Sequence, residues 1–328
     1  MKFVYVLVSS ENDYYYEECV VSITSLLRRN PSAHIVLLID DKTQRTLISG
    51  RKEIKELASE VIVQEFDVSV KQKVRSRLLK TSMRQLVQGD FLYIDTDTVI
   101  ADNLNSIENF EYDLGMVLDM HMPVSNNHKQ MYENAKRLKY SVGYNNLHFN
   151  SGVIWVRDTL QNRAFFKMWN ELYKETLIRG IDIDQASLNE VNCRMGGIIA
   201  ELSGVWNVQV NCGVKFLAYA KIIHYLGFQP KNKQAKYFTA LPFELSNVDY
   251  LDEMKENGKI TKKINAIIEE PKTAFTEGVI IPRDSITYII LHSNHMRVLK
   301  FIYVELRTVY CLLEKIYGYI FKKIFKRV

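Results

Sequence analysis

The sequence contains little glycine, proline and cysteine: 14 Gly, 6 Pro and 4 Cys among 328 residues. The low glycine and proline content excludes a collagen-like chain. A hydrophobic fraction of 47% excludes a disordered one. The cysteines are scattered and form no CxxC pair, so neither a disulfide scaffold nor a zinc finger is predicted, and we expect reduced thiols in a cytoplasmic protein. They are Cys19, Cys193, Cys212 and Cys311.

Long apolar runs and the common nucleotide-binding signatures are also absent. No stretch of about 18 apolar residues occurs, so no transmembrane helix is expected. Residues 2–8 are aromatic and β-branched and lead into polar residues, which predicts a first buried strand rather than a signal peptide. No GxGxxG follows this strand, and no GxxxxGK[ST] occurs anywhere, so the usual dinucleotide and P-loop signatures are missing.

The positive charge is concentrated in the C-terminal segment. The whole chain has a net charge of +5, whereas residues 297–328 alone carry +6, so the rest of the chain is close to neutral. This distribution argues against a general nucleic-acid-binding surface, and we expect no nucleic-acid partner.

Apolar segments alternate with helical segments along most of the chain, which predicts an α/β protein with a mainly parallel sheet buried on both faces. The predicted strands are 2–8, 34–39, 61–66, 91–94, 114–119 and 149–156. The predicted helices are 17–29, 43–59, 76–87, 159–179 and one that opens at 182–185. Ligands bind beyond the carboxyl ends of such strands. Three of these ends carry polar clusters, namely Ser9–Asp13, Asp40-Asp41 and Asp95–Asp97.

The last 80 residues differ from the rest. Residues 246–296 are more polar and predict a connector or small subdomain. Much earlier in the chain, the polar residues 125–128 predict a mobile loop. In 297–328, apolar residues recur every three or four positions among Lys and Arg, which predicts a basic amphipathic helical appendage. This tail either packs on the preceding domain or lies in the interface of an anionic membrane.

Asp95-Thr96-Asp97 is the most specific chemical signal in the sequence. Two carboxylates at i and i+2 point to the same side of an extended chain, where they repel unless a cation lies between them. Mg²⁺ or Mn²⁺ prefers such oxygen ligands and also bridges to phosphate oxygens. We therefore predict a divalent metal at Asp95 and Asp97 and assign Asp95 and Thr96 to nucleotide binding as well.

Four short motifs in order resemble those of the family 8 glycosyltransferases, over roughly residues 1–235. The motifs are Tyr93-Ile94-Asp95-Thr96-Asp97, Phe149-Asn150-Ser151-Gly152-Val153, Asp184-Gln185 through Asn189, and His224-Tyr225-Leu226-Gly227. The resemblance implies a retaining, metal-dependent enzyme that uses UDP-sugars and has the GT-A fold, a Rossmann-like mixed sheet flanked by helices.

The resemblance assigns the metal and diphosphate residues. It makes Asp95 and Asp97 metal ligands and His224 the imidazole that completes the site, for Mn²⁺ or Mg²⁺. Gly227 matches a glycine that lets the backbone approach the diphosphate. Lys231 is the lysine nearest to the family's diphosphate-binding position, but it follows His224 by seven residues rather than six.

The resemblance also assigns the donor sugar. Asn150, Asp184 and Gln185 match residues that hold it, with Gln185 nearest to the reacting face, where an amide oxygen stabilises an oxocarbenium-like centre. Asp119 matches a further sugar-contacting acid.

The remaining assignments concern an arginine near the donor sugar and the loop that binds uridine. Arg77 is expected to reach the sugar or Asp95 and is preferred over the competing Arg84. Ser9, Ser10 and Asn12 correspond to the uridine-binding loop.

Taken together, the motifs and the resemblance imply a hexosyltransferase that moves a hexose from a UDP-sugar to a glycan or lipid-linked saccharide in surface polysaccharide biosynthesis. Its expected domains are 1–245 (catalytic), 246–296 (connector or subdomain) and 297–328 (tail), and its expected location is the inner face of the cell membrane. Two alternatives remain. One is a nucleotidyltransferase, which would normally carry a Gly-rich basic loop that is absent here; the other is a catalytically silent membrane-attached binding protein.

Overall fold

The computed structural model describes residues 1–124, 129–210, 212, 216–227, 239–246, 248–272, 274–276 and 279–281, together with isolated positions between 302 and 320. The expected loop at 125–128 and Lys231 lie outside the described residues, as does most of the tail.

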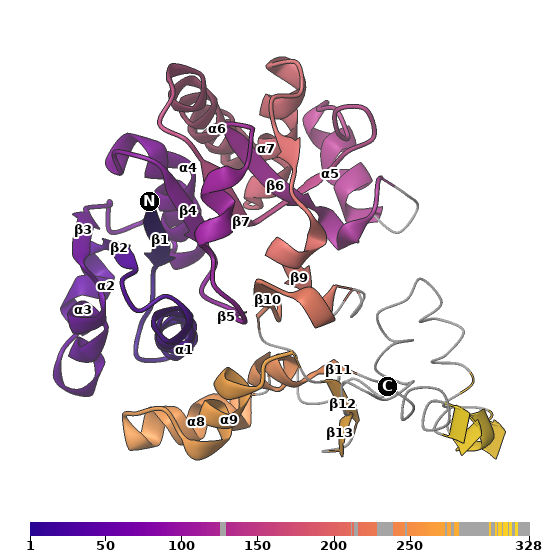
Figure 1. The fold of residues 1–328 in the computed structure, drawn as a ribbon. Helices are drawn as coiled ribbons and strands as arrows, with labels where there is room; N and C mark the ends of the chain where they lie inside the picture. Colours follow the sequence, from indigo (N-terminus) through magenta and orange to yellow (C-terminus); the bar gives the residue numbers. More distant parts are fainter. Residues whose placement is uncertain are drawn as a thin grey trace.

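A seven-stranded mixed sheet forms the centre of the molecule (Figure 1). Its order is β3-β2-β1-β4-β7-β6-β8, and only β7 runs against its two neighbours. The strands are β1 (Lys2–Leu7), β2 (His34–Asp40), β3 (Glu60–Gln64), β4 (Phe91–Ile94), β6 (Leu114–Leu118), β7 (Phe149–Val156) and β8 (Ala200–Glu201). The predicted α/β class with a mainly parallel sheet is confirmed.

Helices cover both faces of this sheet because alternate strand residues feed two apolar cores. On β1, Tyr5 and Leu7 pack in the core under α1, whereas Val4 and Val6 pack in the core under α4, α6 and α7. The helices are α1 (Tyr15–Arg29), α4 (Gln72–Leu86), α6 (Leu160–Ile178) and α7 (Asp184–Arg194). Burial on both faces explains why these strands are continuously apolar. A further helix, α5 (Lys129–Leu138), contacts α7.

The single helix expected over 43–59 is wrong. The chain instead forms α2 (Asp41–Thr46), a 3₁₀ turn η1 (Ser49–Lys52) and α3 (Glu53–Leu57). Ser49 has a φ of 49°, which no right-handed helix accommodates, and the Gly50 that follows favours helix poorly.

A second, three-stranded sheet lies beside the carboxyl end of β4. It has the order β5-β10-β9, formed by β5 (Thr98–Ile100), β9 (Val208–Gln209) and β10 (Ile222–His224). Because β5 starts directly after the Asp95-Thr96-Asp97 turn and pairs with β10, His224 lies opposite Thr98. This pairing brings together residues that are more than 120 positions apart in the sequence.

The segment after 246 is more regular than its polar composition suggests. It forms α8 (Val248–Asn257) and α9 (Lys262–Glu269), which pack on α1 and place Leu251, Ile264 and Ile267 in the core under that helix. A small sheet follows, formed by β11 (Thr239–Ala240), β12 (Ala274–Thr276) and β13 (Val279–Ile281). The boundary at residue 245 stays a prediction.

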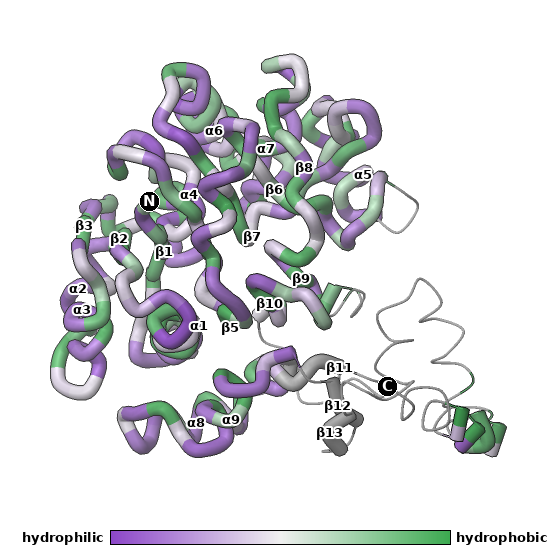
Figure 2. The backbone as a smooth tube through the Cα atoms, viewed as in Figure 1, coloured by the Kyte–Doolittle hydropathy of each residue, from purple (hydrophilic) through white to green (hydrophobic). Residues whose placement is uncertain are grey.

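The described tail residues are helical apart from Leu306. Ile302 is partly buried against the core under α1, whereas the large apolar side chains described from Leu306 onward are exposed. In Figure 2 the described tail residues mix hydrophobic and hydrophilic positions. Among the described residues, no helix combines the length and the apolar character needed to span a bilayer.

The strand end at Asp40 is structural rather than part of a ligand site. Its fully buried carboxylate accepts a hydrogen bond from the amide of Thr43 at 2.8 Å, which caps α2, and it forms an ion pair with the buried Arg75. Among the described residues, the carboxylate of Asp41, the next residue, pairs with the exposed Arg45 at 2.8 Å and accepts a longer hydrogen bond from the Phe66 amide at 3.4 Å.

We predict that Asp40→Ala lowers the free energy of unfolding by about 3–5 kcal/mol, because it leaves the Arg75 charge buried without its partner. Asp41→Ala is the matched control and should cost no more than about 1 kcal/mol, since an i,i+4 pair with an exposed arginine contributes little. Denaturant titration of both variants measures the difference. Equal losses of unfolding free energy in the two variants would show that the buried Asp40–Arg75 pair does not stabilise this strand end.

Candidate active site

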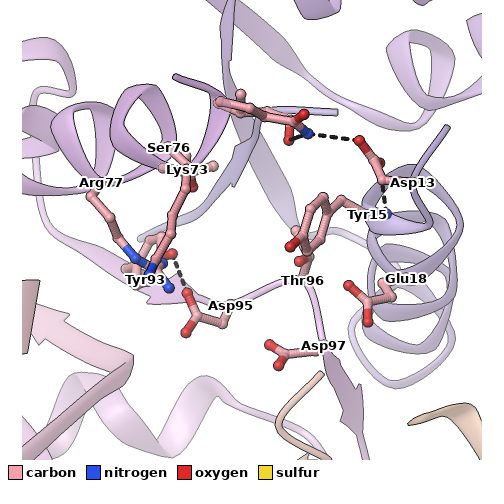
Figure 3. Close-up of a pocket in the computed structure, with 13 residues that line it drawn as sticks. Asp13, Tyr15, Glu18, Lys73, Ser76, Arg77, Tyr93, Asp95, Thr96 and Asp97 are labelled. Atoms are coloured by element: carbon pink, nitrogen blue, oxygen red, sulfur yellow. Dashed lines mark hydrogen bonds between the residues drawn. The ribbon is translucent and has the colours of Figure 1, made fainter. Parts of the chain in front are cut away.

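Asp95, Thr96 and Asp97 lie in the turn between β4 and β5 and line a cavity of about 430 Å³ (Figure 3). The other walls of this cavity come from the β1–α1 loop, from α1 and from α4. They include Asp13, Tyr15, Glu18, Lys73 and Arg77. A cavity of this size matches a drug-sized or nucleotide-sized ligand. It lies beyond the carboxyl ends of β1 and β4, where parallel sheets bind ligands.

His224 completes a cluster of possible metal ligands with Asp95 and Asp97. One ligand atom from each lies within 4.8 Å of the others, and the His224 Nε2 atom is 3.1 Å from Asp97 Oδ1. Two carboxylates and one imidazole form a donor set that suits Mn²⁺ and related divalent cations. These residues therefore fit the metal that the sequence predicts.

A hydrogen bond between Nδ1 of His224 and Asn207 fixes the tautomer of His224. Its Nδ1 atom lies 2.9 Å from Asn207 Oδ1, while the Asn207 amide nitrogen donates to Asn150 Oδ1 at 2.8 Å. The Asn207 carbonyl oxygen therefore faces His224, so Nδ1 carries a proton and Nε2 is directed at Asp97. A neutral imidazole would then present a lone pair to a carboxylate. Only a proton or a cation between the two atoms removes this repulsion.

The electrostatics of the pair agree with this geometry. Burial disfavours the charge on each group, but their mutual attraction outweighs burial, so the pKa of His224 is raised and that of Asp97 is lowered.

Gly152 makes room for the imidazole. A Cβ atom at this position would lie 2.4 Å from His224 Cε1, so any other residue would displace the ring. Gly227 has a φ of 69°, and a Cβ there would lie 3.6 Å from Asp97 Oδ2, so the backbone of Gly227 passes close to the acidic cluster.

Lys80 is a site residue that the sequence analysis missed. Its Nζ atom donates to both carboxylate oxygens of Asp95, at 3.0 and 3.2 Å, and lies over the ring of Tyr93, whose hydroxyl also donates to Asp95. The side chain is only 1% exposed. Its place three residues after Arg77, on the same helix face, was a usable signal.

Arg77 and Asp184 form an ion pair at 3.2 Å, and Arg77 lines the cavity. Burial opposes the charge on Asp184, but Arg77 and Lys80 outweigh it and lower the pKa of Asp184; Asp184 in turn raises that of Arg77. Ser151 donates to the other Asp184 oxygen at 3.2 Å. The competing Arg84 is fully buried at the far end of α4, where it donates to the carbonyls of Val87 and Gly89.

Gln185 and Asp119 line a second cavity of about 240 Å³, beside α5. The Gln185 amide nitrogen donates to the Phe149 carbonyl at 3.1 Å, and Asn150 donates to Asp119 at 3.0 Å. Asn150 thus connects Asp119, through Asn207, to the imidazole of His224.

The β1–α1 loop is organised by Asp13 rather than by the residues predicted for uridine. The Asp13 carboxylate accepts bonds from the hydroxyls of Ser9 and Ser10 and from Gln72, at 2.6–2.8 Å. Burial works against this carboxylate, but the hydrogen bonds outweigh it and lower its pKa. Ser9 is buried and Asn12 is exposed. The residues of the loop that line the large cavity are Val8 and Asp13, followed by Tyr15 at the start of α1.

Comparisons with known proteins fit this architecture. A sequence profile of the nucleotide-diphospho-sugar transferase family matches residues 32–256, more than half of the chain. A search of curated protein sequences gives no match. A crystal structure of an active-site mutant of LgtC covers 81% of this chain and 99% of its own, at 14% identity and a TM-score of 0.53, which shows a shared fold.

Two further structures give TM-scores below 0.5. The galactosyltransferase LgtC with donor and acceptor sugar analogues has 13% identity and a TM-score of 0.49, and covers 81% of this chain and 99% of its own. Mouse xyloside xylosyltransferase 1, apo form, has 16% identity and a TM-score of 0.47, with coverages of 71% and 99%. On the profile match and the fold, the chain belongs to the nucleotide-diphospho-sugar transferase family and is a glycosyltransferase of the GT-A type, related to family 8.

Proposed function

We propose that this protein transfers a hexose from a UDP-sugar, with retention at the anomeric carbon and with a bound Mn²⁺ or Mg²⁺ ion. The observation that carries the proposal is the convergence of Asp95, Asp97 and His224 beside the large cavity. A bound divalent cation would stabilise the negative charge of the departing diphosphate. The strand-end position of the cavity supports a nucleotide as its occupant.

Other residues of the chain orient the metal ligands and contact the donor. Lys80 and Tyr93 hold the Asp95 carboxylate in one orientation, and Asn207 holds the His224 ring, so neither side chain has to be ordered when the donor binds. Gly227 lets backbone amides approach the diphosphate. Tyr15 and Asp13 line the same cavity and are proposed to contact the base and ribose of the donor.

The sugar is proposed to lie between the two cavities, near Asp184, Gln185 and Asp119. Because the Gln185 nitrogen is held by the Phe149 carbonyl, its carbonyl oxygen is the atom left to face developing positive charge at the anomeric carbon. Asp184 is held by Arg77 and Ser151, which suits it to accept hydrogen bonds from sugar hydroxyls.

The acceptor is proposed to be a glycan or a lipid-linked saccharide of a surface polysaccharide, reached at the inner face of the cell membrane. The exposed apolar residues of the described tail, among Lys and Arg in the sequence, support contact with an anionic bilayer.

A hydrolysis screen of UDP-sugars with Mn²⁺, read as release of UDP, tests the proposal. A thermal-shift comparison of UDP with and without Mn²⁺ accompanies it. Preference for a nucleoside triphosphate would favour a nucleotidyltransferase, and no response to any nucleotide would contradict the proposal.

Asp97→Asn should lower Mn²⁺-dependent UDP release by at least about 100-fold. Loss of a metal ligand should lower activity at least as much as loss of a residue that merely hydrogen-bonds to a ligand. Asp102→Asn is the matched control, since Asp102 pairs with Lys221 and Lys272 away from the cavity. Circular dichroism checks that both variants fold. Normal turnover by Asp97→Asn would remove the metal assignment.

Gln185→Ala should lower kcat by about 100-fold while leaving the Kd of UDP with Mn²⁺ unchanged, because its oxygen acts on the transition state rather than on the nucleotide. Single-turnover kinetics and calorimetry separate the two quantities. A large change in Kd with an unchanged kcat would place Gln185 in nucleotide binding instead.

Removal of residues 297–328 should abolish co-sedimentation with anionic phosphatidylglycerol vesicles, because the tail holds the basic excess and an exposed apolar stripe. Neutral phosphatidylcholine vesicles provide the control for the full chain. Undiminished sedimentation of the truncated protein with anionic vesicles would contradict the membrane role of the tail.

A further inference from the structure

Glu18 is an acidic side chain buried in the wall of the large cavity, where no described residue hydrogen-bonds to it. It is 1% exposed, and neither of its carboxylate oxygens has a hydrogen-bond partner among the described residues. It belongs to the lining of the large cavity, and in Figure 3 its carboxylate points away from α1 toward the space beside Asp97. A buried carboxylate with no partner is destabilising, so its presence calls for an explanation.

The neighbouring charges make the position more unfavourable still. Burial, followed by the carboxylates of Asp97 and Asp13, raises the pKa of Glu18 well above its usual value. The basic residues that line the same cavity are already paired: Arg77 with Asp184, and Lys73 with Asp182 at 2.8 Å. The acidic side of the cavity therefore has more negative charge than the described residues balance.

Glu18 is not itself one of the clustered ligand atoms, which come from Asp95, Asp97 and His224. Residues that hydrogen-bond to the ligands of a metal orient those ligands and tune the affinity for the metal. Their loss typically weakens metal binding 10–100-fold. A carboxylate that accepts hydrogen bonds from metal-bound water would gain both a partner and a nearby positive charge.

We propose that Glu18 is a positioning residue of the metal site, which accepts a hydrogen bond from water on the divalent cation and so raises the affinity of the protein for that cation. The proposal rests on the metal dependence in the proposed function. It concerns a residue on α1 that none of the sequence motifs includes.

Glu17 offers a matched control on the same helix. It is also buried, at 3% exposure, and one of its oxygens is likewise unpartnered among the described residues. It faces a different cavity, lined by Tyr16, Arg51 and Lys255, and not the one that holds Asp97. Glu17→Gln therefore changes the same charge without approaching the metal.

The experiment titrates Mn²⁺ into the full-length wild type, Glu18→Gln and Glu17→Gln, and counts free Mn²⁺ by electron paramagnetic resonance. Glu18→Gln should raise the Kd for Mn²⁺ about tenfold, and Glu17→Gln should leave it within twofold. The melting temperature of metal-free Glu18→Gln should equal or exceed that of the wild type, because the variant removes a buried carboxyl group that has no partner among the described residues.

An unchanged Mn²⁺ affinity in Glu18→Gln, or an equal loss in both variants, would overturn the inference. So would a Glu18→Gln variant that is destabilised without metal, since this would reveal a structural role. Failure of the wild type to bind Mn²⁺ would instead overturn the metal dependence of the proposed function, so the two failures are distinguishable.

Discussion

The site depends on the approach of one imidazole nitrogen to one carboxylate oxygen. His224 Nε2 and Asp97 Oδ1 are 3.1 Å apart, and Asn207 holds the ring so that this nitrogen is directed at Asp97. Two acceptors at this distance are stable only with a proton or a cation between them. A cation held by these two side chains would also stabilise the negative charge of a departing diphosphate, so one ion would meet both requirements.

The fold produces this approach through two sheets rather than one. The large sheet places Asp95 and Asp97 at the end of β4, and the small sheet pairs β5 with β10, which fixes His224 by its register opposite Thr98. Asp95 is held separately by Lys80 and Tyr93. The acidic turn is therefore preorganised from the α4 side and from the β10 side, which reduces the reordering needed when a donor binds.

Much of the fold and the centre of the site followed from the sequence, for physical reasons. Segments such as 34–39 and 149–156 are buried on both faces, so their continuous apolar character and their length identify them directly as strands. Asp95 and Asp97 were visible because two acids after a buried strand are costly without a cation. His224 required the resemblance to a family, since nothing local to 222–224 reveals a partner in β5.

Other features depended on contacts that a linear pattern does not contain. Asn207 contributes by orienting the His224 ring, and Lys80 contributes by holding the carboxylate of Asp95, 15 residues away. The helix expected over 43–59 fails at Ser49, whose left-handed backbone conformation is not encoded by its residue type. Glu18 could be noticed as an acid within an apolar stretch of α1, but only the structure shows that it faces Asp97 (Figure 3).

The central claim is most directly tested by a crystal structure of the full chain with UDP and Mn²⁺, measured at the manganese absorption edge. The account predicts one anomalous peak bonded to Asp97 and His224, with the diphosphate of UDP on the same ion. UDP bound in the cavity with no manganese signal between these side chains, or manganese bound elsewhere, would contradict it.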